Sequence, residues 1–443
     1  MLPLFKFPRE YAGLSQEMLE RCLSDVSAYR TWRAADPGPS CSLDARYAAL
    51  PALNKAEIRQ HFPQGFVPAE RDVQQGLASG EIIFIETSGT TENRVPNIWN
   101  QAWWDASERA SWQLNSVAAR LATGTHAEAI LANAVNVGPV SDEADLPFTS
   151  RRLARFVYLN EKTNPAAWTP SLMDRMLEEL SSFKPAVLEA NPSLLAKLCR
   201  YASGQKGVFQ PGLIVFTYER PTLLHEQQIR RVFPEVPFTS SYGATEVGYV
   251  FMQCEAGRLH QNSEYCRVDF QPLRPEHGGP LLGRILVTTF HNPWFYILRF
   301  HVGDLVRLDE SGRCPCGRQT GFILTGVEGR VADATLTTGG RLVTVGELDR
   351  AMSAIDGIDE YSLEQLTAGE YSLHLVTRAA EEPLRREATA RLRELYGLGA
   401  HIGVSFEKAL VPEVSGKYRI ARSSLPIRIE DYLAALNSCE VIQ

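Results

Sequence analysis

The pattern of apolar and polar positions predicts an α/β core in the first part of the chain. Short apolar runs of strand type alternate with segments of helical spacing. Such alternation is typical of strands joined by crossover helices, so we expect a largely parallel sheet. The expected strands are residues 81–86, 129–132, 186–189 and 213–216, and the expected helical segments are 101–121, 171–180 and 193–201.

The pattern changes near residue 255. Residues 284–290 and 304–308 are strand-like, and no long helical segment lies between 255 and 328. We therefore expect a β-rich subdomain over residues 255–328, attached to the α/β core.

The last part of the chain predicts a separate small α+β domain. Its boundary with residues 1–330 is expected near Val331. At 443 residues the chain is also too long for one ordinary core, which supports a division into domains. The expected helices are residues 346–355 and 382–396, and the expected strands are 359–366, 371–376 and 401–406.

Composition excludes several classes of protein. The chain is 44% hydrophobic and 22% charged, as in soluble globular proteins, and its net charge of −7 argues against a nucleic-acid partner. No apolar run approaches the roughly 20 residues of a membrane span, and the first residues lack the pattern of a signal peptide. We expect a cytoplasmic protein without a disulfide framework, although it has eight cysteines.

A candidate phosphate loop follows the strand at 81–86. It reads Thr87-Ser88-Gly89-Thr90-Thr91. Glycine lets a backbone approach closely, and hydroxyl and N–H groups donate hydrogen bonds to phosphate oxygens. The alternative interpretation is a Ser/Thr-rich surface turn.

Four further motifs follow in order. They are residues 242–246 (Tyr-Gly-Ala-Thr-Glu), 299–304 (Arg-Phe-His-Val-Gly-Asp), 329–330 (Gly-Arg) and 416–417 (Gly-Lys). With the loop, they resemble the adenylate-forming (acyl-CoA synthetase) superfamily. Residues 48–59 and 314–318 resemble its phenylacetate–CoA ligase branch. The resemblance covers roughly residues 45–420.

This resemblance implies an architecture and an activity. The fold would be a large α/β domain that binds ATP and an acid over residues 1–330, with its β-rich subdomain, and a small mobile domain over 331–443. The activity would be activation of an aryl carboxylic acid by ATP and Mg²⁺, with release of pyrophosphate and transfer of the acyl group to CoA. The branch often forms dimers, so a homodimer is expected.

The resemblance also assigns the nucleotide residues. It implies phosphate binding by Ser88, Gly89, Thr90 and Thr91, adenine contacts from Tyr242, Gly243 and the Tyr218-Glu219 turn, and ribose contacts from Asp304 and Arg330. Thr245 would lie near the α-phosphate and Glu246 at Mg²⁺. Carboxylates are suitable ligands for Mg²⁺, and a carboxylate can accept hydrogen bonds from both ribose hydroxyls.

Lys417 is the expected catalytic lysine. Negative charge grows at the α-phosphate while the substrate carboxylate attacks it, and an ammonium that reaches both groups stabilises that transition state. A solvated lysine near the C-terminus is the alternative.

Three departures from the family pattern keep other functions open. Glu92-Asn93-Arg94 replaces the usual Gly-Lys-Pro, Ala332 occupies the hinge position, and a proline expected after the next loop is absent. The alternatives are adenylation with transfer to a carrier-protein thiol or an amine, and a non-catalytic paralogue that binds an acyl ligand.

Three cysteines and a histidine form a candidate zinc site. Cys254, His260, Cys314 and Cys316 make a Cys₃His set, which is typical of closed structural zinc sites. Cys266 is an alternative ligand, and plain buried thiols are the alternative interpretation.

The acyl pocket is expected between the α-phosphate and a set of neutral side chains. The two asparagines in this set hint at a polar substituent on the acid, and aromatic residues there are more often core. The candidates are Asn133, Asn136, Gly138, Phe148 and Ser241.

Overall fold

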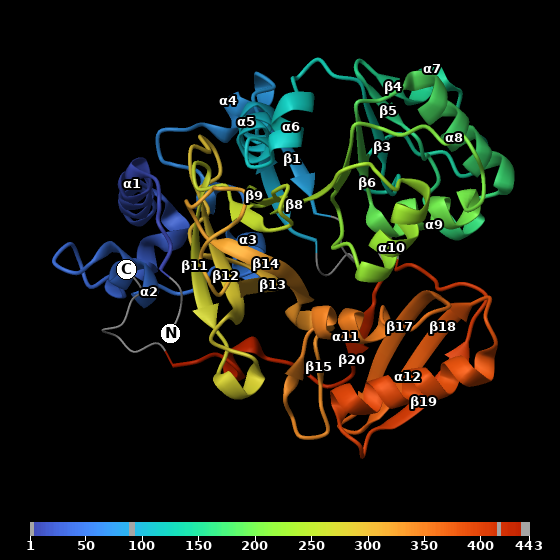
Figure 1. Cartoon of the computed structure of the whole chain (residues 1–443). Helices are drawn as coiled ribbons and strands as arrows, with labels where there is room; N and C mark the ends of the chain where they lie inside the picture. The colour runs from blue at the N-terminus through green and yellow to red at the C-terminus, as the bar shows by residue number, and fades with distance from the viewer. Residues whose placement is uncertain (1–3, 88–93, 414–417, 436–443) are drawn as a thin grey trace. The chain divides into compact units, whose positions relative to one another are not determined.

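The computed structural model describes residues 4–87, 94–413 and 418–435. The chain divides into two units (Figure 1). The first unit contains residues 1–119, 241–326 and 433–443, and the second contains 120–240 and 327–432. Strands β8 (Phe238–Ala244) and β14 (Ile323–Arg330) each pass from one unit to the other along the chain.

The first unit contains an antiparallel sheet with the strand order β11-β12-β13-β14-β10-β9-β8. Its strands, besides those named above, are β9 (Gly248–Gln253), β10 (Leu259–Gln261), β11 (Cys266–Pro272), β12 (Leu282–Thr289) and β13 (Phe300–Leu308). Strand β12 is buried along its whole length, and its middle residues, 285–287, are all apolar.

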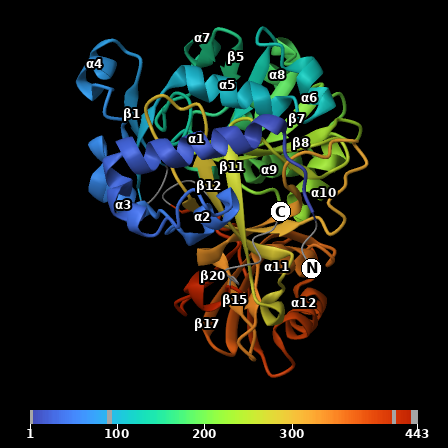
Figure 2. The same ribbon diagram turned by 90° about the vertical axis from the view of Figure 1, so that its left-hand side faces the viewer.

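The N-terminal segment of the first unit is mainly helical. Its helices are α1 (Arg9–Asp25), α2 (Leu43–Ala49), α3 (Lys55–His61), α4 (Val73–Ala78), α5 (Gln101–Trp112) and α6 (Ser116–Leu121), the last of which ends in the second unit. Helix α1 lies across β11 and β12 (Figure 2). The Tyr11 hydroxyl accepts a hydrogen bond from the Val268 backbone N–H at 3.3 Å, which fixes the helix against β11.

The second unit begins with a mostly parallel sheet in the order β8-β7-β6-β3-β5-β4. Its strands are β3 (Glu128–Leu131), β4 (Arg152–Leu153), β5 (Phe156–Tyr158), β6 (Val187–Ala190) and β7 (Leu213–Phe216). Its helices are α7 (Phe148–Arg151), α8 (Pro170–Phe183), α9 (Pro192–Ala202) and α10 (Leu223–Val232). Residues of α8, α9 and α10 form one core with the strands, so these helices share a face of the sheet.

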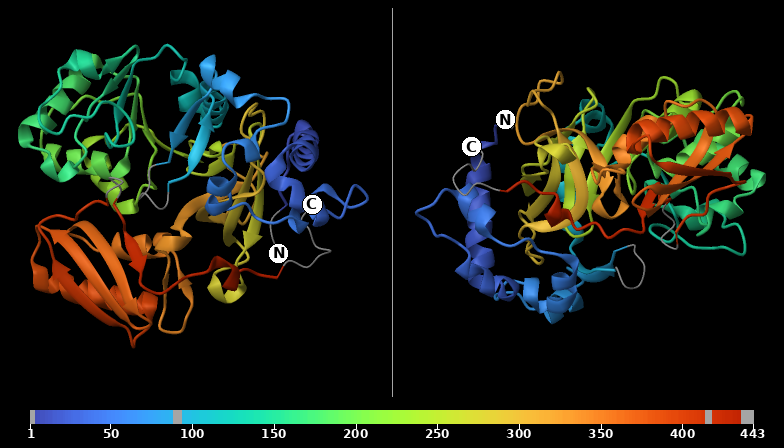
Figure 3. Two further views of the ribbon diagram at one scale, coloured as in Figure 1. Left: turned by 180° about the vertical axis from the view of Figure 1, so that it is seen from behind. Right: turned by 90° about the horizontal axis from the view of Figure 1, so that it is seen from below.

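The remainder of the second unit is a four-stranded sheet covered by a helix. The strand order is β19-β18-β17-β20, and α12 lies across it (Figure 1). Seen from behind, the strands of this sheet face the viewer (Figure 3). The elements are β15 (Thr335–Leu336), β16 (Leu342–Val343), α11 (Val345–Met352), β17 (Ile358–Thr367), β18 (Glu370–Thr377), α12 (Glu381–Tyr396), β19 (His401–Phe406) and β20 (Ala421–Ser423).

The fold confirms the α/β core, the β-rich region and the α+β pattern near the C-terminus, with local differences. The expected helix at 101–121 is two helices, because Asn115 caps a new helix by accepting hydrogen bonds from the backbone of Val117 and Ala118. The strand expected at 81–86 is β1 (Ile83–Glu86), which pairs only with β2 (Pro96–Trp99) among the described strands. In the described part of the chain, no helix combines the length and hydropathy that a membrane span requires.

Candidate active site and cysteine cluster

The end of β8 and the tight turn that joins it to β9 carry the predicted nucleotide residues Tyr242 to Glu246. Gly243 is required there, since a Cβ at this position would lie 2.2 Å from the Gly248 carbonyl oxygen. Val247 donates its backbone N–H to Ala244 at 3.0 Å, which closes the turn. The glycine in this motif therefore lets β8 and β9 approach closely and fixes the direction of the residues on either side.

Two of the predicted nucleotide residues lie together. The Tyr242 hydroxyl donates to the Asp304 carboxylate on β13 at 2.9 Å. The Tyr242 ring also packs against Phe251, with ring centroids 6.0 Å apart. An aromatic face from β8 and a carboxylate from β13 are thus held side by side, an arrangement suited to a base and a sugar.

Glu246 is the buried carboxylate of this turn, with 3% of its side chain surface exposed. The Lys55 ammonium, at the start of α3, lies 4.0 Å from its Oε1 atom. Carboxylate oxygens are typical protein ligands of Mg²⁺, so Glu246 is a suitable ligand for that ion. Sequence reasoning missed Lys55, because nothing in its local pattern indicates this contact.

The phosphate loop itself, Ser88 to Thr91, lies outside the described residues. Its flanks form an antiparallel hairpin of β1 and β2. Two hydrogen bonds between Thr87 and Val95 close this hairpin. The Thr87 N–H donates to the Val95 carbonyl at 3.1 Å, and the Val95 N–H donates to the Thr87 hydroxyl at 3.0 Å. Arg94 pairs with Glu86 at 3.3 Å.

A second turn, after β7, carries Tyr218, Glu219 and Arg220. The Glu219 carboxylate accepts from the Ser193 hydroxyl at 2.7 Å. Arg220 donates to the Val327 carbonyl at 2.6 Å and pairs with Asp349, which is fully buried, at 3.2 Å. The turn therefore anchors α9, β14 and α11 to one another, a role that its sequence does not indicate.

The residue that follows the predicted catalytic lysine contacts the turn after β7. Lys417 lies outside the described residues. Tyr418, the next residue, donates its backbone N–H to the Glu219 carboxylate at 3.3 Å and packs against the core of the parallel sheet.

The predicted hinge region is held by two clusters of polar side chains. Arg419 donates to Asp333 at 2.7 Å and to the Ala332 carbonyl at 3.0 Å. Glu328, buried on β14 ahead of Arg330, accepts from the Thr344 hydroxyl at 2.8 Å.

Gly346 occupies part of the segment from which the expected proline is missing. A Cβ at Gly346 would lie 2.1 Å from the Glu328 carboxylate. The helix α11 begins here with a capping box between Thr344 and Glu347. Gly346 therefore makes room for the Glu328 carboxylate at the start of α11.

The predicted acyl residues have different environments. Asn133 is used by its own loop, since its amide donates to Thr163 and accepts from the Val135 backbone. Gly138 has φ +96° and abuts the Tyr158 ring. Phe148 packs against the helix-side core with Phe183.

Two predicted acyl residues have polar atoms that the fold does not satisfy. The Asn136 Oδ1 atom and the Ser241 Oγ atom are buried and have no hydrogen-bond partner among the described residues. Asn136 lies in the second unit and Ser241 on β8 in the first.

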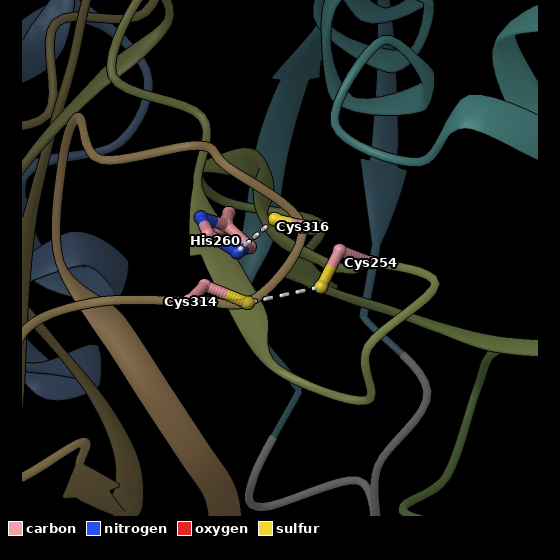
Figure 4. Close-up of side chains that lie close together, drawn as sticks. All are labelled: Cys254, His260, Cys314 and Cys316. Carbon is pink, nitrogen blue, oxygen red and sulfur yellow. Dashed lines mark hydrogen bonds between the residues drawn. The ribbon is translucent and has the colours of Figure 1, made fainter.

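Cys254, His260, Cys314 and Cys316 come together in the first unit (Figure 4). Their ligand atoms all lie within 4.8 Å of one another. The sulfurs of Cys254 and Cys314 are 3.6 Å apart, and the Cys316 sulfur is 3.4 Å from the His260 Nε2 atom. A tetrahedral zinc ion with Zn–S bonds of about 2.3 Å separates two sulfur ligands by about 3.8 Å, so these positions fit the ion.

The environment of the cluster also suits a metal. Burial lowers the pKa of His260 to about 4, and the Arg318 charge acts in the same direction. The imidazole is therefore neutral near pH 7, which is the form that ligates a metal. Cys266, the alternative ligand, is instead directed to the Asn262 carbonyl at 3.5 Å.

Comparison with known proteins supports the fold. No protein-family model matches the chain, and no curated protein matches it. A solved structure of 2-hydroxyisobutyryl-CoA ligase with 2-HIB-AMP in the postadenylation state matches with a TM-score of 0.69 and 17% identity, covering 95% of this chain and 91% of that one. A benzoate-CoA ligase from Burkholderia xenovorans LB400 matches with a TM-score of 0.51 and 14% identity, over 79% and 69% of the two chains.

An anthranilate-CoA ligase in complex with anthranoyl-AMP matches with a TM-score of 0.50 and 14% identity, over 76% of this chain and 66% of that one. The chain therefore has the fold of the adenylate-forming CoA ligases, as the sequence resemblance implied. At these identities the likeness defines the fold alone.

Proposed function

We propose that this protein activates a carboxylic acid with ATP and passes the acyl group to CoA. In the first step a carboxylate oxygen attacks the α-phosphorus of ATP, the bond to the β-phosphate oxygen breaks, and pyrophosphate leaves with the displaced electron pair. In the second step a thiolate attacks the acyl carbon, and AMP leaves.

The observation that supports this proposal most is the grouping of Tyr242, Asp304 and Glu246 within one unit. The Tyr242–Asp304 hydrogen bond of 2.9 Å prepares a surface for adenosine, and the buried Glu246 supplies a ligand for Mg²⁺. The magnesium ion would neutralise charge on the phosphates. The fold supports the same assignment, because the neighbours named above include complexes with acyl-adenylates.

We assign the remaining roles by the same reasoning. Thr245 lies in the turn next to Glu246, so its hydroxyl is a suitable donor to the α-phosphate. Lys417 supplies the ammonium, and the contact of Tyr418 with Glu219 supports this role because it brings the adjoining chain to the turn after β7. Arg330 supplies a donor to the ribose. Residues 331–443 remain a proposed mobile domain, and the branch, the cytoplasmic location and the homodimer also remain proposals.

The experiment is acid-dependent exchange between ATP and pyrophosphate, with a panel of aryl and arylacetic acids, run with and without CoA. We expect exchange with at least one acid and a thioester when CoA is added. Exchange without a CoA thioester would favour a carrier-protein thiol or an amine as acceptor. No exchange, combined with no Mg·ATP binding by calorimetry, would contradict adenylation and favour a non-catalytic paralogue.

We also propose a structural zinc ion at the Cys₃His cluster. Four protein ligands leave no open position, so the ion would connect the loops that carry these residues rather than take part in the reaction. We expect one zinc per chain by elemental analysis. Cys254→Ser should lower both the zinc content and the melting temperature, whereas Cys266→Ser, at a buried cysteine outside the cluster, should retain the zinc. Zinc-free wild-type protein with an unchanged melting temperature would contradict the proposal.

A further inference from the structure

A row of side chains crosses the parallel sheet of the second unit on the face opposite its helices. The register places Tyr158, Ile130 and Glu189 beside one another on β5, β3 and β6. Leu188 and Ala190, on either side of Glu189, pack into the core with the helices. Because side chains alternate along a strand, Glu189 points to the other face, as do its neighbours in the row.

The row combines an apolar centre with a polar side chain on either side. Adjacent strands are about 4.8 Å apart, so Tyr158 and Glu189 are separated by roughly 10 Å across Ile130. Ile130 is buried and apolar, while both flanking residues are partly exposed. The row lies at the carboxyl ends of parallel strands, where α/β sheets bind ligands.

Glu189 is held in place by an unusual residue. The Tyr218 hydroxyl donates to its Oε1 atom at 2.5 Å. Tyr218 has φ +70°, a conformation that is costly for a bulky side chain and that often marks a functional site. Burial raises the pKa of Tyr218 well above its usual value, and the Glu189 charge adds to this effect, so Tyr218 remains a donor to a charged carboxylate.

The loop after β3 adds a second acceptor. Gly138 lies against the Tyr158 ring, and a Cβ there would come within 2.9 Å of it. The nearby Asn136 Oδ1 atom is buried without a partner among the described residues. An unsatisfied buried carbonyl costs about 1–3 kcal/mol, which a donor on a bound ligand would recover.

We propose that this row is the specificity-determining floor of the acid pocket, and that it selects an acid carrying a hydroxyl or amino group on its body. The inference rests on the proposed function. The apolar body of the acid lies on Ile130, and its donor group faces Glu189 or Asn136. An acid with a methyl group in place of the donor desolvates these oxygens without donating a hydrogen bond to them, so it is rejected.

The test uses pairs of acids that differ only in this group. Hydroxy- and aminobenzoates are compared with the methylbenzoates of the same substitution position, and 2-hydroxyisobutyrate with 2,2-dimethylpropanoate. Both kcat/KM for ATP–pyrophosphate exchange and acid binding by calorimetry are measured. We expect the wild-type protein to prefer one hydroxyl- or amino-bearing acid over its methyl analogue by about 100-fold or more. Comparison of the hydroxybenzoates with the aminobenzoates then shows which of the two donor groups is preferred.

Variants separate a specificity role from a structural one. Glu189→Leu should reduce that preference to within about threefold or reverse it, while Glu189→Gln, which keeps an acceptor, should retain part of it. Tyr218→Phe should weaken the preference by a smaller factor. Glu178→Leu, at an exposed glutamate on α8, is the matched control and should leave the preference unchanged.

Equal use of methyl and donor-bearing acids by the wild-type protein would overturn the proposal and leave adenylation intact. An unchanged preference in Glu189→Leu would do the same. Donor-selective binding without exchange would instead contradict the proposed adenylation while supporting the assignment of the floor. Absence of both exchange and acid binding would contradict both.

Discussion

The turns after β7 and β8 follow consecutive strands, yet they differ in how their side chains are held in place. The β8 turn is built from a local motif, and its main partner, Asp304, belongs to another motif. The β7 turn is tied to residues more than a hundred positions away, above all to Asp349 through Arg220. The comparison teaches that residues for chemistry form recognisable local patterns, whereas residues that anchor such a turn do not.

The largest expected effect concerns the anchored turn. Asp349 is fully buried and accepts from Arg220, from the Leu223 backbone at 3.0 Å and from the Tyr361 hydroxyl at 3.2 Å. Asp349→Ala removes the acceptor of the buried Tyr361 hydroxyl, the Leu223 N–H and the partly exposed Arg220, which keeps only the Val327 carbonyl among the described residues, so the free energy of unfolding should fall by about 3–5 kcal/mol. Urea denaturation measures this change. A loss below 1 kcal/mol would mean that the turn is not anchored there.

The next largest effect concerns Glu246 in the turn after β8. Glu246→Gln removes the charge that holds Mg²⁺, and we expect exchange between ATP and pyrophosphate to fall by about 10²–10³-fold with little change in melting temperature. Glu264→Gln, at an exposed position of the same unit, is the control and should keep full activity. Equal activities in the two variants would remove Glu246 from the mechanism.

A smaller effect should separate binding from chemistry within the β8 turn. Tyr242→Phe keeps the aromatic ring and removes the hydrogen bond to Asp304. A hydrogen bond to a charged group contributes about 1.5–3 kcal/mol, so the KM for ATP should rise roughly tenfold or more while kcat changes little. A fall in kcat at constant KM would assign Tyr242 to the reaction step instead.

The smallest effect is a change in pH dependence near the anchored turn. Burial lowers the pKa of His225 to about 3, and the charges of Arg200 and Arg220 act in the same direction. Glu226 is the next residue along the chain, and Asp349 pairs with Arg220 at 3.2 Å. The pKa of a histidine in the unfolded chain is about 6.5, so between pH 6.5 and pH 3 the unfolded chain binds a proton at His225 that the folded chain does not. The stability that the fold has above pH 6.5 is therefore lost as the pH falls through this range.

His225→Gln removes this titration and still allows the capping box with Thr222. Unfolding free energies measured from pH 7 to pH 4 should therefore decline less steeply in the variant than in the wild type. His401→Gln, at an exposed position on β19, serves as the control. Identical slopes for His225→Gln and the wild type would show that His225 titrates normally in the folded protein.

Sequence reasoning predicted the elements that depend on local patterns. Strand β7 matches the expected residues 213–216, and β19 matches 401–406, because continuous or alternating apolar residues determine both. The break between α5 and α6 was missed, since apolar spacing continues through Asn115 while its side chain starts a new helix.

The candidate site divides in the same way. Tyr242 lies beside Asp304, and the four residues of the Cys₃His set lie together, because each carries a residue type that its chemistry requires; their binding of nucleotide and zinc stays a prediction. Lys55, Asp349 and Glu328 could not be predicted, since their roles arise from long-range packing that no spacing along the chain reveals. The roles of Ser88 to Thr91 and of Lys417 stay predictions.

The most direct test of adenylation follows an oxygen atom. An acid labelled with ¹⁸O in its carboxylate is incubated with ATP, Mg²⁺ and CoA, and the phosphate products are analysed by mass spectrometry. If the carboxylate attacks the α-phosphate, one ¹⁸O atom appears in AMP, and Lys417→Ala forms almost no labelled AMP. Label in inorganic phosphate instead, or thioester formed with unlabelled AMP, would contradict the proposed acyl-adenylate.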